Sequence, residues 1–166
     1  ASVQSSTVMG NWPPFVLTVI MTLMTIGGSS GSTVGALKLM RVITFFKGTY
    51  KHLREILSPE GRVVPLQISG QKLSAKAVAQ SGNYITLYML CILITWSLLC
   101  LFGHDPIEGL FFTMSLQGNV GLEIGHVTSA LQPQLKLISI FNMWSGRLEI
   151  YPVLITIRSV FEIFKR

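Results

Sequence analysis

The sequence predicts an all-α membrane protein in which transmembrane helices alternate with two short re-entrant helices. Hydrophobic residues make up 49% of the chain and charged residues only 12%, whereas soluble domains average about 25% charged residues. Residues 84–102 carry no formal charge and have the length of a membrane span. Two other apolar runs, residues 15–26 and 107–116, are too short to cross a bilayer, because a spanning helix needs about 20 apolar residues.

The first short run, residues 15–26, begins after Pro13 and Pro14 and ends in a loop rich in glycine and serine, residues 27–33. Apolar runs of about 10–14 residues are typical of buried or re-entrant helices. Irregular backbone at membrane depth must be buried in protein or line a water-filled path, because lipid offers its N–H and C=O groups no partner. The loop is therefore a candidate for an ion pathway.

Three longer segments are the predicted membrane spans. The first covers residues 34–46, the second residues 84–102 and the third residues 135–164. Lys38 and Arg41 interrupt the first span, and we expect their charged ends to extend toward the membrane surface. Charges that face the protein interior are the alternative. The third span carries the charged side chains Lys136, Arg147, Glu149, Arg158 and Glu162.

Charged residues orient the chain across the membrane. The connector over residues 47–76 is rich in Lys and Arg, whereas the connector over residues 103–134 has acidic residues and no Lys or Arg. By the positive-inside rule the first connector is cytoplasmic and the second is external. The net charge of +6 therefore reflects topology, and because the basic residues flank spans, we expect no nucleic-acid partner.

The second short run, residues 107–116, has a helix start signal. Asp105 can cap the N-terminus, Pro106 suits the first helical position, and Glu108 stands where a capping box places it. Acidic groups at external N-termini direct the C-terminal ends of the short helices into the membrane, where their partial negative charge favours a cation. Ordinary capped helices without a pore would show the same start signals.

Both short helices are followed by a loop that contains glycine, at Gly31 and Gly121. Rings of backbone carbonyls hold a dehydrated alkali cation, and turning carbonyls toward one axis requires residues that tolerate unusual dihedral angles. A loop that only packs two helices together is the alternative. A phosphate-binding loop is not expected, because the segment from Gly28 to Gly35 matches neither the Walker A motif nor the dinucleotide fingerprint.

Arg147 lies near the middle of the predicted span over residues 135–164. An arginine there costs about 2.5–3.5 kcal/mol on insertion scales, so it is expected to face a protein interior or a water-filled cavity. Glu149, two positions away, points to another side of a helix, and pairing with a different buried carboxylate is the alternative. The sequence shows neither metal-ligand spacing nor a set of nucleophile, base and orienting group, so no enzymatic activity is expected.

Three segments together resemble the TrkH/KtrB superfamily of potassium uptake proteins. They are residues 26–38, 118–122 and 146–150, which read IGGSSGSTVGALK, GNVGL and GRLEI. Members of this superfamily have four membrane–pore–membrane repeats arranged like the four subunits of a potassium channel. The resemblance implies that this chain is part of such a four-repeat pore.

The resemblance also implies a division of the chain. Residues 1–46 match the pore helix, filter loop and inner helix of the third repeat, which lacks its first helix here. Residues 47–83 match a basic cytoplasmic connector. Residues 84–166 match the whole fourth repeat.

Site residues follow from the same resemblance. Backbone carbonyls of the two loops would form the ion filter, contributed by Ser29, Ser30, Gly31, Asn119, Val120 and Gly121. They would bind potassium, which is the transported ion. No covalent cofactor is implied. Arg147 matches an arginine that lies below the filter and gates cation passage. In a shifted register, Gly27 or Gly28 would line the axis instead.

The resemblance further implies an integral, multi-pass protein of the plasma (inner) membrane. Its partners would be the lipid bilayer, the remaining two and a half repeats of the same subunit, a second subunit in a homodimer, and a cytosolic nucleotide-binding regulatory ring. Two alternatives stay open, a sodium-permeable relative of the same family and a non-conducting helical membrane scaffold.

Overall fold

The computed structural model describes residues 12–29, 35–58, 67–68, 71–72, 74–122, 124 and 132–164. In chain order the elements are α1 (Pro14–Ile26), α2 (Leu39–Leu57), β1 (Gln67–Ile68), β2 (Gln71–Lys72), α3 (Ala75–Leu101), α4 (Pro106–Gly118), α5 (Pro133–Leu148) and α6 (Ile150–Phe164). The two strands form one short antiparallel ribbon in which Gln67 pairs with Lys72 and Ile68 with Gln71. The described chain is otherwise helical, as predicted.

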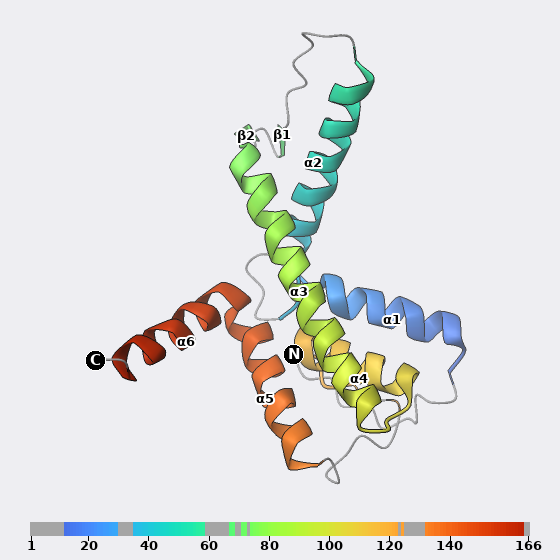
Figure 1. Ribbon diagram of the computed structural model, residues 1–166. Helices are drawn as coiled ribbons and strands as arrows, with labels where there is room; N and C mark the ends of the chain where they lie inside the picture. The colour runs from blue at the N-terminus through green and yellow to red at the C-terminus, as the bar shows by residue number, and fades with distance from the viewer. Residues whose placement is uncertain are drawn as a thin grey trace.

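The helices are arranged around α3 (Figure 1). α2 packs antiparallel to the N-terminal half of α3, and α4 packs against its C-terminal half. The short helices α1 and α4 lie side by side, and α5 also packs against α4. α6 leaves the end of α5 in a new direction. Near the middle of the molecule lie the C-terminal ends of α1, α4 and α5 and the start of α2.

The helix α3 includes nearly all of the span predicted over residues 84–102 and begins nine residues before it. Within the part of the chain that the structure describes, α3 is the one helix long and apolar enough to cross a membrane. Its N-terminus is capped by Ser74, whose side chain accepts a hydrogen bond from the backbone N–H of Ala77. One face of the helix is buried at helical spacing, through Tyr84, Tyr88, Ile92, Thr95 and Leu99.

The two short helices agree with the short apolar runs of the sequence. α1 begins at Pro14 and α4 at Pro106, each with proline in the first turn. Asp105 caps α4 as predicted, because its carboxylate accepts hydrogen bonds from the backbone N–H groups of Ile107 at 2.9 Å and Glu108 at 3.2 Å. Local start signals therefore set where both helices begin.

The helix predicted over residues 34–46 starts later and ends later than expected. Ala36 and Lys38 have φ values of 80° and 65°, a region that helices exclude. The intervening chain is instead held to the end of α1, since the backbone N–H of Leu37 donates to the carbonyl of Thr25 at 3.1 Å. α2 therefore begins only at Leu39 and continues to Leu57.

The prediction of a single helix over residues 135–164 is wrong. The chain forms α5 and α6, which are separated at Glu149, where φ is 69°. Pro152 has no backbone N–H, and in a continuous helix its ring would meet the carbonyl of Leu148. The helix therefore breaks ahead of this proline, and Arg147 lies at the end of a helix and not in its middle.

Candidate functional site

The C-terminal ends of α1 and α4 meet. Gly118, the last residue of α4, lies so close to α1 that a Cβ there would be 2.9 Å from the carbonyl oxygen of Met24. Each helix ends where one of the predicted filter loops begins. Because the C-terminal end of a helix carries a partial negative charge of about half an elementary charge, this junction brings two such charges together.

The loop after α4 has a defined conformation. Asn119 is left-handed, with φ 53° and ψ 42°, and Gly121 has a φ of 85°. The backbone N–H groups of Asn119 and Val120 donate to carbonyl oxygens of the last turn of α4, at 3.1 Å and 3.0 Å. The side-chain amide of Asn119 donates to the carbonyl oxygen of Met143 in α5, also at 3.1 Å. The loop is thereby tied to both helices.

Glycines let two further segments approach the end of α4. A Cβ on Gly35 would lie 2.9 Å from the carbonyl oxygen of Gly118. A Cβ on Gly146 of α5 would overlap the carbonyl oxygen of Gln117. The chain that follows the first loop and the last turns of α5 therefore both pack directly on the backbone of α4.

A cavity of about 390 Å³ lies beside the second loop. Its lining combines the second predicted filter segment with the predicted gate residue; the lining residues are Asn119, Val120, Gly121, Arg147, Ser115, Leu116 and Met143. Arg147 is exposed, and none of the ion pairs between described residues involves it. Arg147 therefore lines the cavity without a carboxylate partner among the described residues.

The first predicted filter segment is only partly described. Ser29 lies exposed beyond the end of α1, whereas Ser30 and Gly31 lie outside the described residues. Gly27 has a φ of 72°, and a Cβ there would be 2.6 Å from the Cβ of Ala36. A close contact between the two sides of the loop thus requires glycine at position 27.

Gln117 was not singled out from the sequence. Its side chain is fully buried in the last turn of α4, and neither amide atom has a hydrogen-bond partner among the described residues. A buried polar group without a partner costs about 1–3 kcal/mol. A strongly polar residue immediately after the apolar run of residues 107–116 is the signal that could have identified it.

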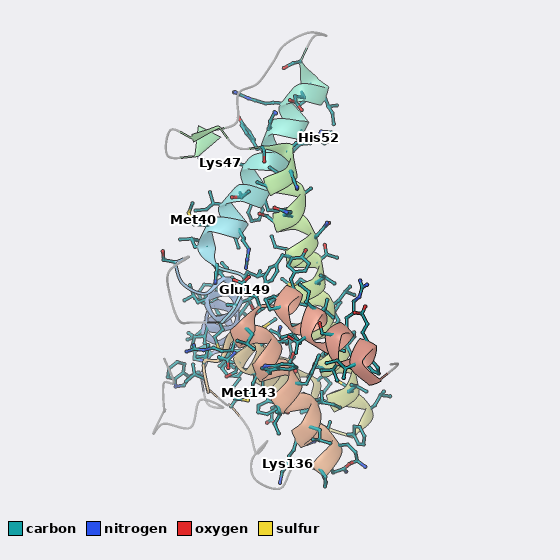
Figure 2. All side chains as sticks on the ribbon, turned by 90° about the vertical axis from the view of Figure 1, so that its left-hand side faces the viewer. Met40, Lys47, His52, Lys136, Met143 and Glu149 are labelled. Carbon is teal, nitrogen blue, oxygen red and sulfur yellow. The ribbon has the colours of Figure 1, made fainter. Side chains whose placement is uncertain are left out.

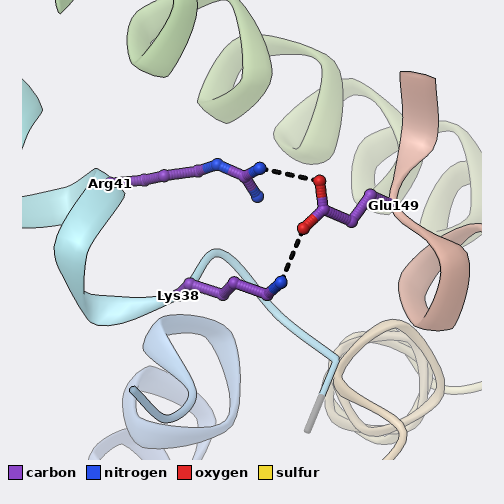
Figure 3. A network of polar contacts seen from close by, with 3 residues as sticks. All are labelled: Lys38, Arg41 and Glu149. Atoms are coloured by element: carbon purple, nitrogen blue, oxygen red, sulfur yellow. Dashed lines mark hydrogen bonds and ion pairs between the residues drawn. The ribbon is translucent and has the colours of Figure 1, made fainter. Parts of the chain in front are cut away.

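Lys38 and Arg41, for which the sequence favoured extension toward the membrane surface, instead form ion pairs within the protein. Figure 3 shows both side chains directed at the carboxylate of Glu149. In Figure 2, Glu149 and Met143 lie between the two ends of the molecule, with Lys47 and His52 toward one end and Lys136 at the other. The two basic residues therefore share one partly shielded carboxylate that is distant in sequence.

Comparison with known proteins gives one family. A family model described as TrkH, cation transport protein, matches residues 5–163. An uncharacterized cation transporter of Methanocaldococcus jannaschii is 29% identical over 92% of this chain. The Trk system potassium uptake protein TrkH of Escherichia coli K12 is 25% identical over 92% of the chain.

A solved structure has the same fold. The crystal structure of the potassium transporter TrkH from Vibrio parahaemolyticus superposes with a TM-score of 0.80, at 24% identity, over 92% of this chain and 33% of the transporter chain. This chain spans about a third of the length of its curated relatives, 32% of the Methanocaldococcus and Escherichia proteins.

Proposed function

The chain belongs to the TrkH family of cation transport proteins, and from this premise we propose that it forms part of a potassium-conducting pore in a membrane transporter subunit. Cations would pass along backbone carbonyls of the loops that follow α1 and α4. The relatives named as potassium uptake proteins support potassium as the transported ion.

The meeting of the C-terminal ends of α1 and α4 carries this proposal. The two helix ends, each with a partial negative charge, lie against one another. The described lining of the cavity beside the second loop contains no acidic side chain. Such a region attracts a cation but does not bind it as tightly as carboxylates would. Conduction requires this balance, since an ion must enter the site and also leave it.

We assign the filter to the backbone carbonyls of both loops. Ser29, Ser30 and Gly31 would contribute from the first loop. Asn119, Val120 and Gly121 would contribute from the second. The left-handed Asn119 and the positive φ of Gly121 support this assignment for the second loop, because such dihedral angles turn successive carbonyls away from a helical direction.

Arg147 would act as the gate. Its side chain shares a cavity with the second loop and lacks an ion pair among the described residues. A fixed positive charge beside the path of a cation raises the energy of that cation, and the effect is large where water is scarce. Movement of the guanidinium away from the path would lower this barrier.

The complete pore needs more than this chain. The three parts proposed from the sequence are a partial third repeat (residues 1–46), a connector (residues 47–83) and a fourth repeat (residues 84–166). The remaining two and a half repeats of the subunit would close the pore within a plasma-membrane protein. A second subunit and a cytosolic nucleotide-binding ring are further proposed partners.

Rubidium uptake into proteoliposomes that hold the complete subunit tests the proposal. We expect Gly121→Asp to reduce uptake at least about tenfold, because its side chain is forced into a left-handed backbone and brings a carboxylate to the filter. Gly103→Asp is the matched control, since Gly103 also has a positive φ of 86° but lies away from the loops, and a Cβ there would meet no atom within 4 Å. Arg147→Ala is expected to change uptake as well.

Each outcome has a distinct meaning. If wild type carries rubidium and both site variants match the Gly103→Asp control, the filter and gate assignments are wrong. If the complete subunit carries no rubidium under any ionic condition, the chain serves as a non-conducting scaffold. Uptake of sodium in preference to rubidium would identify a sodium-permeable relative.

A further inference from the structure

One carboxylate joins two parts of the chain that are more than a hundred residues apart. Glu149 Oε1 lies 2.6 Å from Lys38 Nζ, and Glu149 Oε2 lies 2.7 Å from Arg41 Nη2 (Figure 3). All three side chains are shielded, with exposed fractions between 24% and 28%. Ion pairs at this depth are screened less than ion pairs on an open surface.

The backbone at both ends of this link is in an unusual conformation. Lys38 and Glu149 have φ values of 65° and 69°, a region that residues with a Cβ rarely adopt. Lys38 ends the segment between the first loop and α2, and Glu149 separates α5 from α6. The side-chain contacts therefore coincide with the two points where the chain changes direction.

Aromatic packing extends the same cluster to α3 and α6. The guanidinium carbon of Arg41 lies 4.0 Å from the ring centroid of Tyr84, a residue of α3 that is 1% exposed. The ring centroid of Tyr84 is in turn 5.9 Å from that of Tyr151 in the first turn of α6. Arg41 thus contacts both the carboxylate before α6 and the aromatic residue that packs on α6.

Within the described parts of the chain, Glu149 is the one acidic residue that forms ion pairs with Lys38 and Arg41. Without its charge, two cations would face each other at short range with no compensating anion. Like charges in a shielded site repel strongly. The junction between α5 and α6 would then have to move away from the start of α2.

We infer that Glu149 is a positioning residue for Arg147, and this inference rests on the proposed function of Arg147 as a gate. Arg147 lies two residues before Glu149, at the end of α5. Anchoring of Glu149 to Lys38 and Arg41 fixes where α5 ends and hence where the Arg147 guanidinium lies in the cavity beside Asn119. Because Lys38 also directly precedes α2, the same contact couples the segment after the first loop to the end of α5.

The accessibility of a cysteine placed at position 147 tests this inference without a transport measurement. The complete subunit would carry Arg147→Cys in a background whose other cysteines are replaced, and the rate of its modification by a charged methanethiosulfonate reagent would be measured. We expect Glu149→Gln to change this rate at least about threefold, the lower range of coupling between contacting residues. Glu162→Gln is the matched control, because it removes a carboxylate from an exposed ion pair with Arg158 on α6, and it is expected to leave the rate unchanged.

A transport measurement tests whether Glu149 acts through Arg147. We expect Glu149→Gln to change rubidium uptake at least about threefold in wild type, but less than about 1.5-fold in an Arg147→Ala background. Glu149→Asp, which keeps the charge, is expected to retain most of the wild-type rate. If Glu149→Gln fails to accumulate in membranes, the double variant Lys38→Gln with Glu149→Gln takes its place in both measurements. This double variant has the same net charge in the cluster as wild type.

The outcomes separate the inference from the proposed function. An unchanged modification rate, or an undiminished effect of Glu149→Gln in the Arg147→Ala background, overturns the inference and leaves the pore assignment intact. Wild-type uptake in Arg147→Ala instead rejects the gate, and the inference falls with it. A changed modification rate together with a non-additive transport effect supports the positioning role.

Discussion

Gly146 of α5 packs directly against the carbonyl oxygen of Gln117 in the last turn of α4 and leaves no space for a Cβ. This contact sets the distance between α5 and the end of the short helix that leads into the second loop. Because Gly146 immediately precedes Arg147, it also sets how closely the proposed gate residue approaches that loop. Replacement at this position is therefore a sensitive probe of the site.

We expect Gly146→Ala to separate α4 from α5 and to lower the stability of the subunit by about 1–3 kcal/mol, the usual range for overpacking a close contact. Rubidium uptake is expected to fall as well. Thermal unfolding in detergent and uptake in proteoliposomes measure the two effects. Gly82→Ala in α3 is the control, since a Cβ there would lie an ordinary 3.5 Å from Phe45; equal behaviour of both variants would contradict the packing argument.

Asn119 combines a left-handed backbone with a side-chain hydrogen bond to Met143. We expect Asn119→Gly to keep the backbone conformation and lose only the bond, at a cost of about 0.5–1.5 kcal/mol. Asn119→Ala adds backbone strain and is expected to be less stable than Asn119→Gly. Thermal unfolding of the two variants in parallel checks this order, and the rubidium-to-sodium uptake ratio shows whether loop geometry affects selectivity.

Local signals made the short helices predictable. Pro14 and Pro106 in the first turns, and the Asp105 cap, act within a few residues of the chain, so sequence alone located α1 and α4. The apolar run of residues 84–102 likewise located most of α3, because a long uncharged run favours a continuous apolar helix. These features depend on neighbouring residues and not on tertiary contacts.

The break at Glu149 depends on both local and distant residues. Pro152 was a local signal against one continuous helix over residues 135–164. The partners of Glu149, however, are Lys38 and Arg41, which lie 111 and 108 residues away. No pattern within a single helix indicates such a pair, so sequence analysis favoured cations that reach toward the membrane surface, left interior charges as the alternative, and could not name their partner.

Asp105 provides a test of stability that is separable from conduction. We expect Asp105→Ala to destabilise the start of α4 by about 1 kcal/mol, since the backbone N–H groups of Ile107 and Glu108 lose their acceptor. Asp105→Asn keeps a capping oxygen and is expected to stay close to wild type. Thermal unfolding measures both variants. An altered rubidium-to-sodium uptake ratio in Asp105→Ala would mean that this helix start also influences the filter.

Gly48 allows the packing of α2 on α3 to be tested by rescue. A Cβ on Gly48 would overlap the side chain of Val78, so Gly48→Ala is expected to force the two helices apart and to cost about 1–3 kcal/mol. Val78→Ala removes both methyl groups that the new Cβ would meet, and the double variant is expected to recover more than half of the lost stability. Thermal unfolding of the two single variants and the double variant gives the coupling between the positions. Additive losses would show that the helices do not approach at these residues, whereas recovery supports the antiparallel pairing of α2 with α3.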